Sequence, residues 1–347
     1  MAQDSTDVKD TIGALDDYVL LGRSGLRISP LCLGAMTFGE KFGLGTNYEG
    51  SKEVFDCYFE KGGNFIDTAN VYNYGESEQF LKELIADKRS QVVLATKYSS
   101  NPTSMAQNVN GNHRKSLTEN VNESLKRLGT GYIDLLYVHI WDFRTPIEEV
   151  MRSLDDVVRS GKVLYVAISD APAWVVSGAN MLADLRGWSR FIGLQTRYNL
   201  LDRSLEFDLQ PACAEYDVGI IPWGCVAEGF LTGKHTRESI AEKASDTGNY
   251  RNSALIKTAK KEQNWKILDE VIAIATEIKK SPVQVALNWM SQKPGITAPL
   301  VGARTKAQLV ENLKALEFKL TPEQMARLDA VSAPNDIPFP YSMYRRG

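Results

Sequence analysis

Two kinds of segment alternate along most of the chain. Short, mostly apolar runs are each followed by a longer stretch in which apolar residues recur every three to four positions. The first kind is typical of strands buried on both faces, and the second of amphipathic helices. The expected strands span residues 31–35, 64–70, 92–98, 133–141, 163–169, 191–198, 220–223 and 297–302.

Repeated strand–helix units predict a parallel sheet, because each crossover helix returns the chain to the same strand direction. Eight units either close into a barrel or form an open doubly wound sheet, and their number alone does not decide. Before the first unit, residues 18–28 have the pattern of a β-hairpin that turns at Arg23, Ser24 and Gly25. The long connection at 227–261 is rich in Gly, Thr, Ser and charge, which indicates either a lid over a site or a plain insertion.

Composition narrows the classes of function. The formal net charge of −3 gives no basic surface for nucleic acid. The four cysteines are far apart, which argues against a metal site or a disulfide framework. The N-terminus is polar, and no uncharged apolar stretch reaches the roughly 18 residues that a membrane helix requires. We therefore expect one cytoplasmic domain over residues 1–347, with residues 1–16 flexible.

Four polar residues stand at or just beyond the C-terminal ends of three successive expected strands: Asp67, Tyr72, Lys97 and His139. In a parallel barrel these ends share one face, where such enzymes have their active sites. The set suits reduction of a carbonyl group, because a protonated tyrosine can donate a proton and a nearby lysine lowers its pKa. The aspartate would keep the lysine charged, and a neutral histidine would donate a hydrogen bond to substrate. Taken singly, each residue is also consistent with a cap, an ion pair or packing.

From about residue 18 to residue 332 the chain resembles the aldo-keto reductase superfamily. The resemblance is carried by LCLGAMTFG at 31–39, FIDTANVY at 65–72, DLLYVH at 134–139, PIEEV at 146–150 with GKV at 161–163, and GFLTGK at 229–234. It implies an α/β fold, a (β/α)8 TIM barrel with an N-terminal β-hairpin and extra C-terminal helices. It also implies Tyr72 as general acid, Lys97 and Asp67 as the pair that tunes it, and His139 as the donor that orients the carbonyl.

The same resemblance implies a site for NADPH or NADP+, in which Trp223 stacks on the nicotinamide. The chain departs from the family at Asp170, where asparagine is usual, and an ionised aspartate can only accept hydrogen bonds. It departs again at 223–226, where many relatives have a turn that contains Ser-Pro. The expected cofactor contacts are Gly34, Met36, Thr37, Asp67, Ser169, Asp170, Gln195, Trp223, Gly224, Val226, Gly229, Leu231, Lys234, Gly302, Arg304, Gln308, Glu311 and Asn312.

The sequence favours NADPH over NADH. The GxGxxG motif of a Rossmann dehydrogenase is absent, since the stretch at 43–48 lacks the last glycine. Arg304 stands instead before a helix expected at 306–316, and a helix N-terminus with an arginine attracts phosphate. This resembles the family's site for the adenosine 2′-phosphate, with Gln308, Glu311 and Asn312 near the adenine. Arg304 is also consistent with an ordinary solvated helix start.

The substrate is less constrained. Phe38 and Trp141, together with Tyr72 and His139, are the expected substrate contacts, and they favour an apolar or aromatic aldehyde or ketone. The aromatic residues are equally consistent with packing. Two other functions stay open: an NADPH-binding regulatory subunit with little turnover, and an NAD(P)+-dependent dehydrogenase of a sugar or polyol. No metal, nucleic acid or membrane is expected, and the oligomeric state is open.

Overall fold

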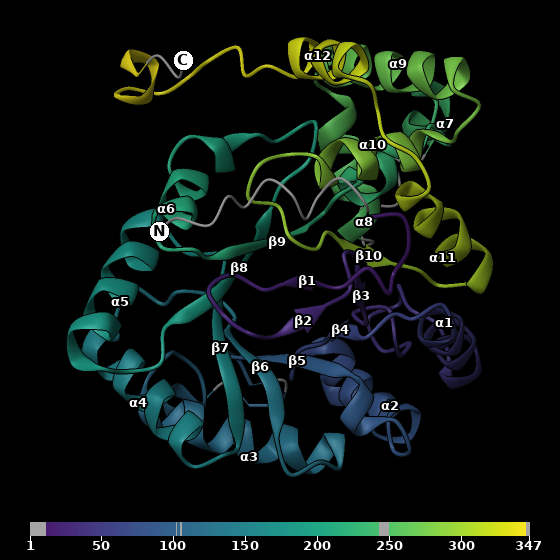
Figure 1. The fold of residues 1–347 in the computed structure, drawn as a ribbon. Coiled ribbons are helices and arrows are strands. Elements are labelled where there is room, and N and C mark those ends of the chain that lie inside the picture. Colours follow the sequence, from purple (N-terminus) through teal and green to yellow (C-terminus); the bar gives the residue numbers. More distant parts are fainter. Residues whose placement is uncertain (1–11, 102, 105, 243–249, 345–347) are drawn as a thin grey trace.

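The computed structural model describes residues 12–101, 103–104, 106–242 and 250–344. Its centre is a sheet of eight parallel strands with helices around the outside (Figure 1). In spatial order, β10 pairs with β3, and each strand from β3 to β8 pairs with the next. The strands are β3 (Cys32–Gly34), β4 (Phe65–Asp67), β5 (Val93–Tyr98), β6 (Ile133–Val138), β7 (Val163–Ser169), β8 (Phe191–Arg197), β9 (Gly219–Trp223) and β10 (Leu300–Gly302).

The two ends of this strand order meet at a seam. Ile220 of β9 forms a parallel bridge with Ile296, just before β10. The Ile220 amide donates to the Gly295 carbonyl at 3.1 Å, and the Thr297 amide donates to the Ile220 carbonyl at 2.8 Å. The sheet therefore closes into a barrel, which decides between the two architectures that the strand count left open.

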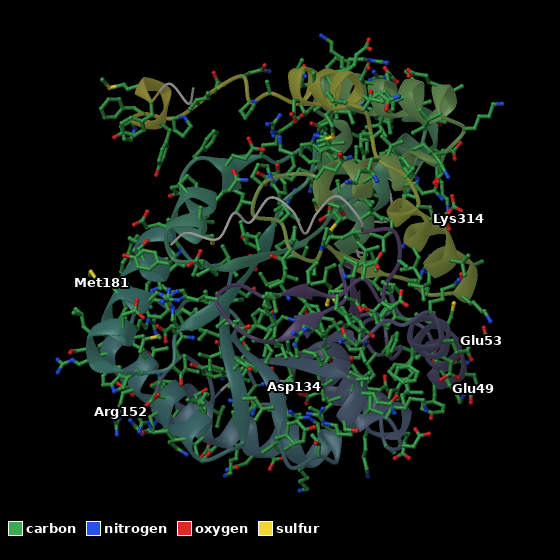
Figure 2. The ribbon with its side chains drawn as sticks, in the orientation of Figure 1. Glu49, Glu53, Asp134, Arg152, Met181 and Lys314 are labelled. Atoms are coloured by element: carbon green, nitrogen blue, oxygen red, sulfur yellow. The ribbon has the colours of Figure 1, made fainter. Side chains whose placement is uncertain are left out.

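Helices follow the strands and cover the barrel. The outward faces of these helices carry charged side chains, such as Glu49 and Glu53 on α1 and Arg152 on α4 (Figure 2). In contrast, Asp134 of β6 is buried and pairs with Arg89 at 2.7 Å. The helices that follow β3 to β8 in turn are α1 (Tyr48–Glu60), α2 (Glu76–Leu84), α3 (Arg114–Leu128), α4 (Ile147–Arg159), α5 (Ala173–Arg186) and α6 (Leu209–Glu215), while α10 (Pro282–Ser291) precedes β10 and α11 (Lys306–Leu313) follows it.

The predicted N-terminal hairpin is present and covers one end of the barrel (Figure 1). Strands β1 (Val19–Leu20) and β2 (Arg27–Ile28) pair antiparallel. Leu21 and Ile28 are fully buried and pack on residues at the N-terminal ends of the barrel strands, such as Phe65 and Ile192. Gly22 has a φ of +50°, and a Cβ there would lie 2.2 Å from the Ile192 carbonyl, so this contact requires glycine. The hairpin closes this end and leaves the opposite end for a site.

Two regions are more structured than the sequence suggested. Residues 12–16 belong to the segment that we expected to be flexible, but Leu15 is buried in the hydrophobic core; residues 1–11 lie outside the described residues. The connection at 227–261 is not a plain loop, since it contains the 3-10 helix η5 (Ala227–Thr232), α7 (Arg237–Ala241) and α8 (Tyr250–Ala259). Residues 243–249 of this connection also lie outside the described residues.

The predicted extra C-terminal helices are α9 (Glu262–Glu277), which precedes α10, and α12 (Pro322–Val331), which follows α11. They pack on each other beside the barrel (Figure 1). Within the described parts of the chain, none of the helices combines the length and the apolar character needed to cross a lipid bilayer.

Candidate active site

Three neighbouring strands bring the predicted acid–base residues to one end of the barrel. Asp67 is the last residue of β4, Lys97 lies near the end of β5, and His139 directly follows β6. Tyr72 lies just beyond β4, in the 3-10 helix η1 (Tyr72–Gly75). Because β4, β5 and β6 are adjacent and parallel, all four residues lie at the C-terminal end of the barrel, opposite the hairpin.

Lys97 is at the centre of this group. Its ammonium donates to the Asp67 carboxylate, to the Thr68 carbonyl at 2.8 Å and to the Tyr72 hydroxyl at 3.3 Å. The side-chain amide of Gln195 donates to the second Asp67 oxygen at 2.9 Å. Burial is the largest single influence and disfavours the charge on Lys97, but the interactions with Asp67 and Tyr72 together outweigh it, so the pKa of Lys97 is raised. Lys97 is therefore an ammonium at neutral pH.

Burial, more than Lys97, sets the acidity of Tyr72. We expected the lysine to lower the pKa of this phenol, and the Lys97 charge does act in that direction. Desolvation of the partly buried phenol acts more strongly in the opposite direction, and the charges of Asp67 and Asp170 add to it. Lys97 thus acts on the pKa of Tyr72 in the expected direction, but burial raises the net pKa. Tyr72 remains a protonated donor at neutral pH.

His139 is held as a neutral imidazole next to Tyr72. The two rings meet edge to face with centroids 6.0 Å apart. Burial lowers the pKa of His139 to about 3, and the Lys97 ammonium acts in the same direction. Its backbone amide donates to the Tyr98 carbonyl at 2.9 Å and to the Ser99 hydroxyl at 3.1 Å. Its Nδ1 is buried and has no hydrogen-bond partner among the described residues. A neutral ring at this place can donate through its other nitrogen.

Beside the tetrad, the ends of β7, β8 and β9 carry further predicted cofactor residues. Ser169 and Gln195 are opposite each other in the β7–β8 register, and both are buried. Asp170 directly follows Ser169 with a left-handed φ of 42°, a conformation that Asp and Asn tolerate better than most residues. Its carboxylate accepts a hydrogen bond from the Trp223 indole at 3.0 Å. Burial raises the pKa of Asp170. Asp170 therefore fixes the edge of the indole that the sequence assigns to the nicotinamide.

The second group of cofactor candidates gathers where β3 and β10 end. Gly34 and Gly302 are opposite each other in the β3–β10 register. The Thr37 hydroxyl donates to the Ala303 carbonyl at 3.1 Å, while Met36 is exposed. These contacts bring the loop after β3 against the start of α11.

Arg304 stands at that helix start with its side chain exposed. Thr305 caps α11 by accepting a hydrogen bond from the Gln308 amide, and the Gln308 side chain accepts from the Arg304 amide at 2.9 Å. The Asn312 side chain donates to the Gly302 carbonyl at 3.4 Å, and the Glu311 carbonyl accepts from Gln284. Gln308 and Asn312 thus hold the backbone of the loop, a role that residue type alone did not indicate.

The turn after β9 holds the remaining cofactor candidates. Gly224 has a φ of 67°, and its carbonyl accepts from the Asn199 side chain at 2.8 Å. Gly229 and Leu231 are buried within η5, whereas Val226 is half-buried and Lys234 is exposed. Only some of these side chains are therefore open to a ligand in this structure.

The arrangement fits a nicotinamide dinucleotide. The expected cofactor contacts form a row along the ends of the strands. At one end of this row, near Lys97 and Tyr72, are hydrogen-bonding side chains and the flat indole of Trp223. The other end offers an exposed guanidinium at a capped helix start. Gly302 lies between them with open space, since a Cβ there would meet nothing within 4 Å. Such a row matches a ligand with a ring at one end and a phosphate at the other.

Comparisons with known proteins agree with this geometry. Residues 30–333 match the model of the Aldo/keto reductase family. The chain is 35% identical to a norsolorinic acid reductase of Aspergillus flavus, over 93% of this chain and 82% of that protein. It is 37% identical to norsolorinic acid reductase B of Dothistroma septosporum, over 98% and 86% respectively. It is also 37% identical to the aryl-alcohol dehydrogenase (NADP(+)) of Phanerodontia chrysosporium, over 93% and 87%. The chain belongs to the aldo/keto reductase family.

As an aldo/keto reductase, the protein is an oxidoreductase that interconverts carbonyl and alcohol groups with a nicotinamide cofactor. The resemblance that the sequence motifs indicated is confirmed, and so is the barrel fold.

The aromatic residues expected to contact substrate in this aldo/keto reductase are placed differently from the tetrad. Phe38 is completely buried in the hydrophobic core, and Trp141 is nearly so. Their burial favours packing, the alternative that the sequence left open. Large apolar side chains are instead exposed in the loops after β3, β4 and β6, where the sequence pattern does not single them out as substrate contacts: Met36, Phe42, Tyr74, Ile140 and Phe143.

Proposed function

We propose that the protein reduces an aromatic aldehyde or ketone to the alcohol with NADPH, and that Tyr72 is the general acid. The observation that carries this proposal is the contact between the Tyr72 hydroxyl and the Lys97 ammonium at 3.3 Å, with Asp67 buried behind it. This places a protonated phenol beside a fixed positive charge, at the end of the barrel that is not covered by the hairpin. It is the arrangement that proton donation to a carbonyl oxygen requires.

Each residue of the tetrad then has a defined task. NADPH, when bound, supplies the hydride. As the carbonyl oxygen gains negative charge, the Tyr72 hydroxyl donates its proton to that oxygen, and Lys97 stabilises the phenolate that remains. Asp67 keeps Lys97 charged and in place. The neutral imidazole of His139 donates a hydrogen bond to the same oxygen and directs one lone pair toward Tyr72.

Two observations support NADPH as the cofactor. Arg304 presents a planar set of donors at the start of α11, where helix amides and the dipole attract anions. The aryl-alcohol dehydrogenase of Phanerodontia chrysosporium, which is 37% identical, carries NADP(+) in its name. We expect the guanidinium to bind the 2′-phosphate that NADH lacks.

Exposed apolar side chains support an aromatic substrate over a sugar or polyol. The rings of Phe42 and Tyr74 meet edge to face with their centroids 5.4 Å apart. Ile140 and Phe143 are exposed in the loop that begins at His139. A sugar would desolvate its hydroxyl groups against these side chains, whereas an aryl group would bury apolar area there. The names of the similar aryl-alcohol dehydrogenases point in the same direction. We further propose that the enzyme works in the cytoplasm on a free small molecule, since its four cysteines are buried thiols without disulfides.

The test is consumption of NADPH and of NADH, followed by absorbance, with aryl aldehydes, aryl ketones, aliphatic aldehydes and sugars. Tyr72→Phe should bind NADPH normally and lower kcat by about 10²–10⁴-fold, because it removes only the acidic proton. The matched control is Tyr18→Phe, which also loses one phenol hydrogen bond, to the Gly62 carbonyl at 2.9 Å, but at the hairpin. Equal rates for Tyr72→Phe and wild type would refute the assignment of the acid. Tight NADPH binding without turnover of any carbonyl would favour a regulatory subunit.

A further inference from the structure

Tyr72 is followed by a turn of rare backbone conformation. Asn73, Tyr74 and Gly75 have φ angles of 48°, 57° and 87°. Only glycine adopts this left-handed region freely, so two successive non-glycine residues there are strained and must be held by their surroundings. The proposed acid therefore sits at the start of a turn whose shape depends on other contacts.

The side chain of Asn73 supplies those contacts. It is completely buried, and its amide donates to the carbonyls of Met36 at 2.9 Å and Phe38 at 3.1 Å. Its oxygen accepts from the Phe42 amide at 2.8 Å. The amide group of Asn73 therefore joins the turn after β4 to the loop after β3 through three backbone groups that lie more than 30 residues away in sequence.

The loop that Asn73 holds also reaches the start of α11. Within the loop, the Thr46 amide donates to the Thr37 carbonyl at 2.9 Å and the Gly39 amide donates to the Thr46 carbonyl at 3.0 Å. The Thr37 hydroxyl in turn donates to the Ala303 carbonyl at 3.1 Å, directly before Arg304. A continuous set of contacts thus runs from the turn at Tyr72 to the candidate phosphate site.

We propose that Asn73 is a positioning residue, which holds Tyr72 against Lys97 and fixes it relative to the loop at residues 36–47. The inference rests on the proposed function, because it takes Tyr72 as the proton donor. The Asn73 side chain does not touch the reacting atoms, since all three of its hydrogen bonds are with backbone groups of the loop. The charged or titratable groups that face Tyr72 are Lys97, Asp67, His139 and Asp170.

Substitution can separate the left-handed backbone conformation of Asn73 from the hydrogen bonds of its side chain. Asn73→Gly keeps the left-handed backbone without strain and removes all three side-chain hydrogen bonds. Asn73→Asp keeps the size and the acceptor for the Phe42 amide, but an ionised carboxylate cannot donate to the Met36 and Phe38 carbonyls. We call the three side-chain hydrogen bonds of Asn73 its clamp. If this clamp positions Tyr72, both variants should show the same loss of kcat.

The chain offers a matched control in Asn288 of α10. Its buried side chain donates to the carbonyls of Ala315 at 2.8 Å and Phe318 at 2.5 Å, and it accepts from the Leu320 amide at 3.0 Å. This is the same clamp to two carbonyls and an amide, formed outside the barrel. Asn288→Ala should therefore lower stability, as loss of such a clamp must, with kcat and its pH dependence unchanged.

The experiment measures kcat for aryl aldehyde reduction against pH, the Kd of NADPH by fluorescence, and thermal unfolding. We expect Asn73→Gly and Asn73→Asp to lower kcat by about 10–100-fold, because a misplacement of about 1 Å can cost that much. The alkaline limb of kcat should move to higher pH, since a phenol released from Lys97 loses the charge that opposes its burial. If instead both variants match Asn288→Ala, with reduced stability and an unchanged kcat profile, the inference is wrong.

Two further outcomes keep the inference separate from the proposed function. If Asn73→Gly does not fold, Asn73→Asp decides on kcat and on the Kd of NADPH; its pH profile is left aside, because the added carboxylate itself raises the pKa of Tyr72. If wild type and Asn288→Ala turn over no carbonyl at all, the proposed function fails. Positioning of Tyr72 is then tested by absorbance titration of its phenol, taken as the difference from the Tyr72→Phe variant. A higher phenol pKa in the uncharged variant Asn73→Gly than in wild type supports the inference, and an unchanged pKa overturns it.

Discussion

Replacing Lys97 with methionine would leave the Asp67 carboxylate buried without its partner. Lys97 and Asp67 are 0% and 1% exposed, so water cannot take the place of the ammonium. Methionine keeps most of the apolar stem but removes the hydrogen bonds to Asp67, Thr68 and Tyr72. Breaking a buried ion pair from one side costs about 3–5 kcal/mol. We expect the free energy of unfolding to fall by about that amount at neutral pH.

The loss should depend on pH. Without Lys97, burial raises the pKa of Asp67 with only the Gln195 hydrogen bond opposing it. A carboxyl group whose pKa is higher in the folded state binds more protons when folded, so its protonated form relieves the penalty at low pH. The stability deficit of Lys97→Met should therefore be smallest near the unfolded pKa of about 3.9 and grow as pH rises, by at most about 1.4 kcal/mol per unit.

The assay is urea unfolding followed by tryptophan fluorescence, for Lys97→Met, Asp67→Asn and the double variant. The double variant should be more stable than the sum of the two single losses predicts, because it leaves no unpaired buried charge. Lys162→Met is the control: the exposed Lys162 ammonium donates to the Asn122 side chain at 2.8 Å, and its replacement should change stability by less than about 0.5 kcal/mol. Additivity of the two losses within about 0.5 kcal/mol would refute the reasoning.

Three further predictions concern single residues. Arg304→Ala should raise the Kd of NADPH by about 10–100-fold and that of NADH hardly at all, measured by fluorescence titration; equal losses would remove the phosphate assignment. Because burial lowers the pKa of His139 to about 3, the unfolded state takes up its proton first as pH falls below about 6.5. Between pH 6.5 and pH 5 the unfolding free energy of wild type should therefore fall by about 1.6 kcal/mol more than that of His139→Gln, measured by urea unfolding. Asp170→Asn should move the alkaline limb of kcat to lower pH, since the Asp170 charge raises the pKa of Tyr72; a shift upward would contradict this.

The barrel and its tetrad could be predicted because both depend on short-range pattern. Strands buried on both faces are mostly apolar, so β5 and β6 appear in the sequence as nearly continuous apolar runs. A polar residue that ends such a run stands out, as Lys97 and His139 do. Parallel strands then bring these ends together without further information.

Features that depend on contacts between distant loops could not be predicted in this way. Asn73 looks like an ordinary turn residue, and nothing in its neighbours indicates that its amide reaches the loop after β3. The bond between Asp170 and the Trp223 indole is likewise a contact across the barrel end. The net pKa of Tyr72 depends on how far water is excluded, which residue types do not show. The sequence left both substrate contact and packing open for Phe38 for the same reason, since an apolar residue shortly after a strand packs inward or outward with the same sequence pattern.

The seam between β9 and the chain before β10 has a consequence for how the barrel is held shut. It is joined through the bridge at Ile220 and Ile296, whereas β6 and β7 are paired over nearly their whole length. Trp223 ends the strand on one side of this seam, and Gly302 ends the strand on the other. A molecule that bound both Trp223 and Gly302 would join β9 to β10 across this seam. A cofactor that bound both residues would then stabilise the closed barrel as well as take part in the reaction.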